Sequence, residues 1–234
     1  GPVQTEITPE VCLKIGHAAG IVLKEEGLES VMIGKDTRVS GYMLEAALEA
    51  GFIAAGINVR LLGPIPTPGV AYLTKTSRKQ FGLVISASHN NFLDNGIKIF
   101  DDNGVKISRD IELKIEKVLK SDLNLVETSS LGKAEAFHES TARYIEFCKS
   151  TVPSDISFNN LRIVIDCANG ACYKVSPEIF KELGAEVIPF GVDPDGFNIN
   201  HECGSTHPEL AQEMVLKHRA DYGVTLDGDG DRVI

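Results

Sequence analysis

The sequence predicts an α/β protein made of two tandem three-layer domains whose sheets are mixed but mostly parallel. Short apolar strands alternate with helical patterns along the chain, an order that places a mostly parallel sheet between two layers of helices. The alternation occurs twice, on either side of a loose polar stretch at residues 121–136. Polar residues follow several of these strands, and ligands of such sheets bind beyond the carboxyl ends of the strands.

The first domain is expected over residues 1–134, where helix start and stop signals delimit the elements. Thr8-Pro9 places a capping residue before a proline at the first helical position, which predicts a helix that Gly27 ends. By the same logic Ser40 is expected to cap a second helix and Thr67-Pro68 to start a third. The other expected elements are strands at 31–33, 58–62 and 82–85, a hairpin over 95–107 and a helix over 109–119.

The second domain is expected over residues 135–234 and repeats the alternation. A helical stretch at 140–150 lies next to the domain boundary. Ser176-Pro177 is expected to start a helix that Gly184 ends, and Pro208 to start one that ends near Arg219. The expected strands are 162–165, 186–189 and 221–226.

Composition excludes several functional classes. The net charge of −10 argues against nucleic acid as a partner, because such binding rests on clustered Lys and Arg. The five cysteines form no CxxC pair, so a zinc site is not expected, and we interpret them as reduced thiols of a cytoplasmic protein. No apolar stretch approaches the ~20 residues that span a bilayer, so no membrane association is expected.

Residues 227–231 alternate three aspartates with two glycines directly after an apolar strand. Three carboxylates so close together repel one another unless a cation is bound, and hard oxygen ligands of this kind suit Mg²⁺. A solvated acidic turn is the alternative. A calcium EF-hand is excluded because Arg232 stands where that loop requires glycine and a strand precedes the loop in place of a helix. No P-loop or Gly-x-Gly-x-x-Gly motif is present.

A second polar stretch, Ser-Ala-Ser-His-Asn-Asn at residues 86–91, follows another apolar strand. A phosphate on Ser88 would supply an oxygen to a Mg²⁺ held by the aspartates, with His89 and Lys98 as proton-transferring or cationic groups. Taken singly, Ser88 is an ordinary turn serine and Lys98 a solvated strand residue. The other polar residues at strand ends are Lys35, Asp36, Arg38, Asp166, Asn169 and Arg232.

The two stretches together resemble the α-D-phosphohexomutases. The stretch at 86–91 is similar to their Ser/Thr-Ala/Gly-Ser-His-Asn-Pro loop, and residues 227–232 are similar to their Asp-Gly-Asp-Gly-Asp-Arg loop. Within the family, residues 33–51, 64–73 and 85–90 look closest to the bacterial enzymes that act on glucosamine phosphates. The resemblance implies the first part of a four-domain enzyme.

The resemblance also implies roles for individual residues. Ser88 would be the phosphoserine, and Asp227, Asp229 and Asp231 would bind one Mg²⁺ together with the Ser88 phosphate. Lys98 would be the general acid/base, its pKa lowered by neighbouring cations. The residues expected around the phosphoryl group or substrate are Arg38, His89 and Arg232.

The implied reaction interconverts glucosamine 6-phosphate and glucosamine 1-phosphate through a 1,6-bisphosphate, in the synthesis of amino-sugar precursors of the cell wall. A hexose 1,6-bisphosphate would be the activating phosphoryl donor, and a homodimer is an expected assembly. Asn91 stands where the family has proline, and the family's third and fourth domains are not in the sequence. The chain is therefore expected to be a fragment that binds Mg²⁺ and carries phosphate but turns over poorly or not at all.

Three alternatives stay open at this point. The chain could belong to an enzyme acting on glucose or mannose phosphates, which shares both loops. It could instead be a phosphosugar- or metal-binding module that has lost turnover. Residues 197–209 are also unusually polar, and their asparagines and hydroxyls either line a cleft between the domains or cap the helix that starts at Pro208. The sequence favours the cap.

Overall fold

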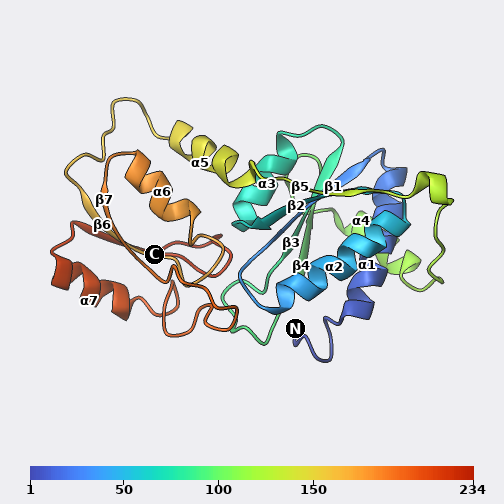
Figure 1. Cartoon of the computed structure of the whole chain (residues 1–234), viewed down its shortest axis with the longest axis horizontal. Helices are drawn as coiled ribbons and strands as arrows, with labels where there is room; N and C mark the ends of the chain where they lie inside the picture. Colours follow the sequence, from blue (N-terminus) through green and yellow to red (C-terminus); the bar gives the residue numbers. More distant parts are fainter.

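The computed structural model describes residues 1–234 and contains two separate sheets, one in each half of the chain (Figure 1). The first sheet has the order β4-β3-β1-β2-β5. All neighbours in it are parallel except β4, which pairs antiparallel with β3. The prediction of a mixed, mostly parallel sheet is therefore confirmed. Its strands are β1 (Ser30–Lys35), β2 (Asn58–Pro64), β3 (Gln80–Ile85), β4 (Ile97–Phe100) and β5 (Ala134–Ala136).

Helices cover both faces of the first sheet. Successive residues of a strand point to opposite faces, so neighbouring residues of β1 identify the helices on each face. Val31 and Ile33 pack in one apolar cluster with residues of α1, α2 and α4, while Met32 packs in a second cluster on the other face with residues of α3 and α5. All three side chains are fully buried. The helices are α1 (Pro9–Glu25), α2 (Ser40–Ala54), α3 (Thr67–Lys75), α4 (Arg109–Val118) and α5 (Ser140–Ser150), with a 3₁₀ turn η1 at Thr128–Ser130.

The second sheet is parallel throughout, with the order β7-β6-β8. Its strands are β6 (Arg162–Asp166), β7 (Glu186–Phe190) and β8 (Tyr222–Thr225). The helices α6 (Val175–Glu182) and α7 (Glu209–His218) lie on opposite sides of it in Figure 1. The helix α5 packs against both α3 and α6, so it bridges the two halves.

Three local expectations are corrected by the structure. Ser40 is already the first helical residue, so it does not cap α2, and its hydroxyl accepts a hydrogen bond from Asn95. Thr67 also caps nothing, since its hydroxyl is bound to a distant aspartate. The expected hairpin is reduced to a single bridge between Phe100 and Lys106 at the edge of β4 that does not face β3, and the chain reaches Ser108, the cap of α4, two residues after Lys106.

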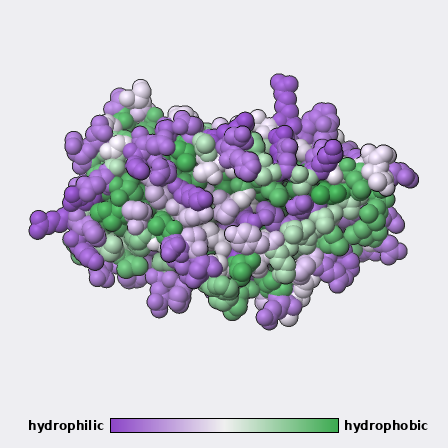
Figure 2. All heavy atoms as spheres, viewed as in Figure 1, coloured by the Kyte–Doolittle hydropathy of each residue, from purple (hydrophilic) through white to green (hydrophobic).

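The polar stretch at residues 121–136 contains a short strand that the sequence did not predict. Strand β5 pairs with β2 and so extends the first sheet. The expected boundary after residue 134 falls within β5, and the division of the chain at that residue stays a prediction. None of the helices is both long and apolar enough to cross a membrane. Hydrophilic residues occupy much of the face shown in Figure 2, interleaved with smaller hydrophobic areas.

Candidate functional site

The loop after β3 presents Ser88 in an unusual backbone conformation. Ser88 has φ +53, in the left-handed region that residues with a Cβ rarely adopt. The Ser86 hydroxyl accepts a hydrogen bond from the Ser88 amide at 2.9 Å, which stabilises the turn. The Ser88 side chain is nearly buried, and its Oγ donates to Oδ2 of Asp227 at 2.6 Å. A hydroxyl of the first half of the chain thus contacts a carboxylate of the second.

Arg38 lies directly behind this loop and is fully buried. Its Nε donates to Oδ2 of Asp36 at 2.8 Å, and its Nη2 donates to the carbonyl oxygens of Ser88 and Asn90, each at 2.9 Å. Its Nη1 donates to the carbonyls of Asn91 and Asp94. In this arrangement the guanidinium shapes the backbone of the serine loop.

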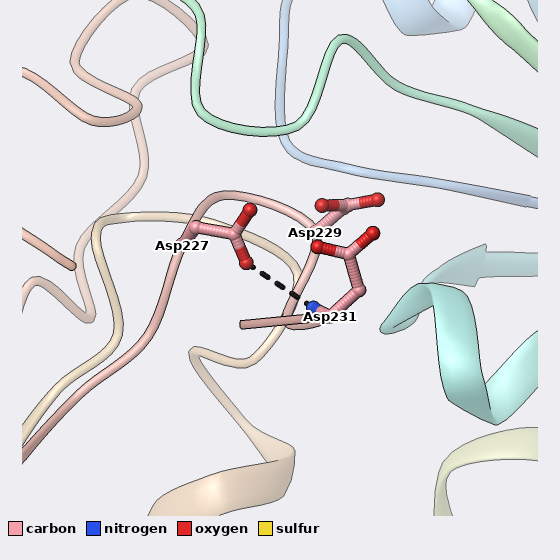
Figure 3. A group of neighbouring side chains, drawn as sticks. All are labelled: Asp227, Asp229 and Asp231. Carbon is pink, nitrogen blue, oxygen red and sulfur yellow. Dashed lines mark hydrogen bonds between the residues drawn. The ribbon is translucent and has the colours of Figure 1, made fainter. Parts of the chain in front are cut away.

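The loop after β8 brings the three aspartates together (Figure 3). One oxygen of each of Asp227, Asp229 and Asp231 lies within 4.8 Å of the others, a grouping that could hold a metal ion. Asp227 is fixed from within the loop, since its Oδ1 accepts from the amides of Asp231 and Arg232 at 3.1 Å. Gly230 allows the curl, because its φ is +67.

Lys98 of β4 lies across from the aspartates, with its Nζ 2.6 Å from Oδ2 of Asp229 and 3.1 Å from Oδ2 of Asp231. Burial alone would lower the pKa of Lys98, but the hydrogen bonds and charges of the two aspartates outweigh it and raise the pKa above its ordinary value. The expectation of a lowered lysine pKa is therefore wrong for this state of the site. The reason is that the nearest charges are carboxylates.

The pKa values of Asp227 and Asp229, the two buried aspartates of the loop, are shifted in opposite directions. Burial raises the pKa of Asp227, and the charges of Asp229 and Asp231 add to this effect although the Ser88 hydroxyl opposes it. Burial acts in the same direction on Asp229, but hydrogen bonds from Lys98 and Thr67 hold its pKa below the usual range. Asp229 is thus the more readily ionised of the two carboxyl groups.

Arg232 and His89 lie beside the serine on the more exposed side of the site. Nη2 of Arg232 donates to Oγ of Ser88 at 2.8 Å and lies 2.5 Å from Nδ1 of His89. Its Nε is 3.4 Å from Oδ2 of Asp227. Because half of the Arg232 side chain is exposed, its guanidinium can face both the hydroxyl and a solvent-borne anion.

The site also includes Thr67, which the sequence analysis did not place there, and Asn200, which it offered only as the less favoured alternative. Thr67 donates its hydroxyl proton to Oδ2 of Asp229 at 2.5 Å, and Asn200 donates from Nδ2 to the carbonyl of Ser88 at 2.9 Å. Asn200 belongs to the polar stretch at 197–209, so the preference for a helix cap was wrong for this residue. The helix α7 has no side-chain cap. The polar composition of that stretch was the signal that could have identified Asn200.

The donor set fits a hard cation. The carboxylates supply oxygen ligands only, and Oδ1 of Asp229 is a buried oxygen without a hydrogen-bond partner. A buried, unpaired carboxylate oxygen is costly and is satisfied when a cation is bound. The arrangement can therefore combine a hydroxyl nucleophile, a cation-binding cluster and two cationic side chains at one point.

Family models cover almost the whole chain. Residues 1–125 match the model described as phosphoglucomutase/phosphomannomutase, alpha/beta/alpha domain I, and residues 142–234 match the model of alpha/beta/alpha domain II.

Relatives of known sequence share both halves. A protein named phosphoglucosamine mutase from Legionella pneumophila (strain Lens) is 59% identical over 230 residues, which are 98% of this chain and 50% of that protein. One of the same name from Aliivibrio fischeri (strain MJ11) is 54% identical over 231 residues, 99% of this chain and 52% of that protein. The chain thus spans about half the length of these relatives.

Solved structures support the same fold. A phosphoglucomutase/phosphomannomutase family protein from Burkholderia thailandensis superposes with a TM-score of 0.83 at 28% identity, over 100% of this chain and 52% of that one. A protein described as a putative phosphomannomutase from Thermus thermophilus superposes with a TM-score of 0.84 at 23% identity, over 100% of this chain and 54% of that one. The second likeness bears on the fold alone.

Proposed function

The chain belongs to the phosphoglucomutase/phosphomannomutase family, and on this premise we propose that it carries the phosphoryl-transfer machinery of a phosphoglucosamine mutase. Such an enzyme is an isomerase that interconverts glucosamine 6-phosphate and glucosamine 1-phosphate. The single observation that carries the proposal is the 2.6 Å hydrogen bond between Oγ of Ser88 and Asp227, inside a cluster of three carboxylates. The names of the relatives that are 54–59% identical favour glucosamine over glucose or mannose.

Ser88 is the residue that we propose to carry the phosphoryl group. When phosphoserine reacts with a sugar phosphate, the P–O bond to Ser88 breaks, a P–O bond to the free sugar hydroxyl forms, and the hydroxyl proton passes to the protein. Return of the other phosphoryl group of the bisphosphate to Ser88 reverses these changes and releases the isomer. Lys98, which lies on the same cluster, is the proposed donor and acceptor of the proton. A cation bound to Asp229 and Asp231 would offset the negative charge that raises the lysine pKa, so that the amine could lose its own proton and accept that of the sugar hydroxyl.

The charge on the transferring group is balanced by a proposed Mg²⁺ and by side chains of the chain itself. A Mg²⁺ held by Asp227, Asp229, Asp231 and an oxygen of the Ser88 phosphate would act as a Lewis acid on the phosphoryl group. Arg232 already donates to Oγ of Ser88, so its guanidinium is placed to follow the phosphoryl oxygens. His89, beside Arg232, is proposed to help position the substrate. Arg38 contributes by holding the loop.

The proposal is tested by phosphoryl uptake. The chain is incubated with Mg²⁺ and glucosamine 1,6-bisphosphate, and its intact mass is measured before and after. We expect a gain of one phosphoryl group that maps to Ser88 and is absent in Ser88→Ala. The matched control is Ser129→Ala, which alters an exposed serine outside the site and is expected to gain the group normally.

Two outcomes would contradict the proposal. No uptake by the unaltered chain would favour a binding module without turnover. Uptake that persists in Ser88→Ala would place the phosphoryl group elsewhere. Parallel incubations with the 1,6-bisphosphates of glucose and mannose compare the three sugars by initial rate.

A further inference from the structure

Two carbonyl oxygens of the serine loop are each held by side chains from opposite halves of the chain. From the first half, Nη2 of Arg38 donates to the carbonyls of Ser88 and Asn90, both at 2.9 Å. From the second half, Nδ2 of Asn200 donates to the same two carbonyls, at 2.9 Å and 3.0 Å. Neither carbonyl lies in a helix or strand, so these side chains take the place of a backbone ladder.

This clamp acts on a residue in an unfavourable conformation. Left-handed backbone at a residue with a Cβ persists only where the surrounding contacts enforce it. At Ser88, φ +53 is the conformation in which Oγ faces Asp227. Relaxation of the loop would rotate the hydroxyl away from the acidic cluster.

Asn200 is itself held firmly in place. It is buried, and its backbone N–H donates to the carbonyl of Ala168 at 2.9 Å. Its φ of +57 is one that asparagine tolerates better than most residues. Below it lies Gly228, where a Cβ would approach both Nδ2 of Asn200 and the carbonyl oxygen of Ser88 to 2.7 Å. The asparagine amide is thus packed between the serine loop and the acidic loop.

We propose that Asn200 is a positioning residue that sets the conformation of the serine loop from the second half of the chain. It touches no reacting atom, and it acts through the carbonyls of Ser88 and Asn90. The conformational part of this inference stands on geometry alone, whereas its effect on phosphoryl transfer rests on the proposed function. The two parts are therefore tested separately.

The conformational test is amide hydrogen exchange over residues 86–91. The informative amides are those of Ser88 and Asn90, which donate to Oγ of Ser86 and the carbonyl of Ala87. In Asn200→Gly, which removes the amide group without straining a positive φ, we expect exchange to accelerate about tenfold or more because the loop opens more often. Unchanged exchange would overturn the proposal.

The matched control is the same substitution at another left-handed asparagine. Asn160 has φ +69, is exposed, and precedes the amino end of β6. The site lies at the opposite, carboxyl ends of the strands of this sheet. Asn160→Gly is expected to leave exchange over residues 86–91 unchanged. Equal acceleration in both variants would attribute the effect to general loss of stability and would overturn the proposal.

The catalytic test measures Ser88 phosphorylation by glucosamine 1,6-bisphosphate in Asn200→Gly and Asn200→Asp. Aspartate keeps the shape and the tolerance of positive φ but aims an oxygen at each carbonyl. In both variants we expect the maximal rate to fall about tenfold or more while the KM for the bisphosphate changes little, because a misplaced nucleophile slows the chemical step. Asn160→Gly is expected to react at the normal rate.

The outcomes separate the two proposals. If the unaltered chain takes up no phosphoryl group, the proposed function fails and the exchange result still decides the role of Asn200 in the loop. If exchange accelerates but the phosphorylation rate holds, Asn200 does not position the nucleophile. A rise in KM alone would make Asn200 a substrate-binding residue and would also overturn the proposal.

Discussion

Asp229 joins the two halves of the chain through its side-chain carboxylate. Its Oδ2 accepts from Thr67 and from Lys98, both of the first half, while its Oδ1 is buried without a partner. An ammonium group therefore neutralises one face of the carboxylate and leaves the other available. A cation at the free oxygen would join a cluster that Lys98 already partly balances.

At the residue scale, we expect Cys12 to make the stability of the chain depend on pH. Its side chain is fully buried in α1, and burial raises the pKa of the thiol from 9.0 to about 11. The folded chain then keeps a proton that the unfolded chain releases, so stability is lost as the pH rises from 9 toward 11. We expect the free energy of unfolding to fall by about 1.4 kcal/mol per pH unit more in the unaltered chain than in Cys12→Ala over that range.

Urea unfolding at a series of pH values measures this difference. Between pH 6 and 8 the thiol is protonated in both states, so the two proteins should show parallel pH dependence there. Parallel curves above pH 9 as well would mean that the thiol ionises as readily in the folded chain as in the unfolded one.

The site residues that the sequence predicted are those with local signals. The serine loop and the aspartate loop are each recognisable from a motif of six residues. The structure brings Ser88, Lys98 and the aspartates together. Thr67 and Asn200 were missed because neither belongs to one of these loops, and only their contacts with residues more than 100 positions away reveal their place in the site. For both residues a short-range pattern, the start of a helix, offered a competing explanation.

At the scale of elements, α1 and α2 cross with their backbones nearly in contact. A Cβ on Gly51 would lie 2.2 Å from the carbonyl oxygen of Leu13, and one on Gly16 would lie 2.5 Å from that of Leu48. Since both neighbouring atoms are backbone, neither can move without shifting a helix. Glycine at these positions permits the close packing of the helical layer on the first sheet.

Alanine at two glycines of α2 should therefore have opposite effects. Gly51→Ala is expected to lower the free energy of unfolding by about 1–3 kcal/mol through overpacking. Gly41→Ala is expected to raise it by about 0.5–1 kcal/mol, because the nearest atom to a Cβ there is Cδ of Lys35 at 3.5 Å, an ordinary van der Waals contact, and alanine restricts the unfolded chain. Urea denaturation of both variants checks this, and equal stabilities would contradict the close crossing.

Elements with strong periodicity and end signals were predicted well, and elements defined by a neighbour were not. Helix α5 begins and ends where the sequence indicates, at Ser140 and Ser150. Strand β5 has three exposed residues and exists because the edge of β2 is free to pair. β4 is likewise defined by a neighbour: it pairs with β3 at four positions, whereas the expected hairpin partner at residues 105–107 forms only one bridge at its other edge.

At the scale of the whole molecule, we expect a divalent cation to keep the two halves of the chain in contact when Ser88 is phosphorylated. The phosphate adds a charge of about −1.5 to −2 beside three carboxylates. With EDTA we expect the phosphorylated chain to open and its radius of gyration to rise, since like charges repel across the contact. Added Mg²⁺ should reverse the change. Small-angle X-ray scattering measures both states.

The unphosphorylated chain provides the control for this experiment. Its halves are joined by the hydrogen bond from Ser88 to Asp227 and by the ion pairs of Lys98. Its radius of gyration should therefore be the same with EDTA and with Mg²⁺. A radius that is identical in all four samples would contradict the charge argument.

The anchoring of α5 limits how far such opening can go. Just before this helix, the amide of Phe137 donates to the carbonyl of Leu61 at 2.8 Å, and the hydroxyl of Ser140, its first residue, donates to that of Leu62 at 3.0 Å. Only residues 151–161 then connect α5 to β6. A tether this short keeps the acidic loop at an effective concentration on the order of millimolar around the serine. Parted halves would meet again before either could diffuse away, whatever the dilution of the sample.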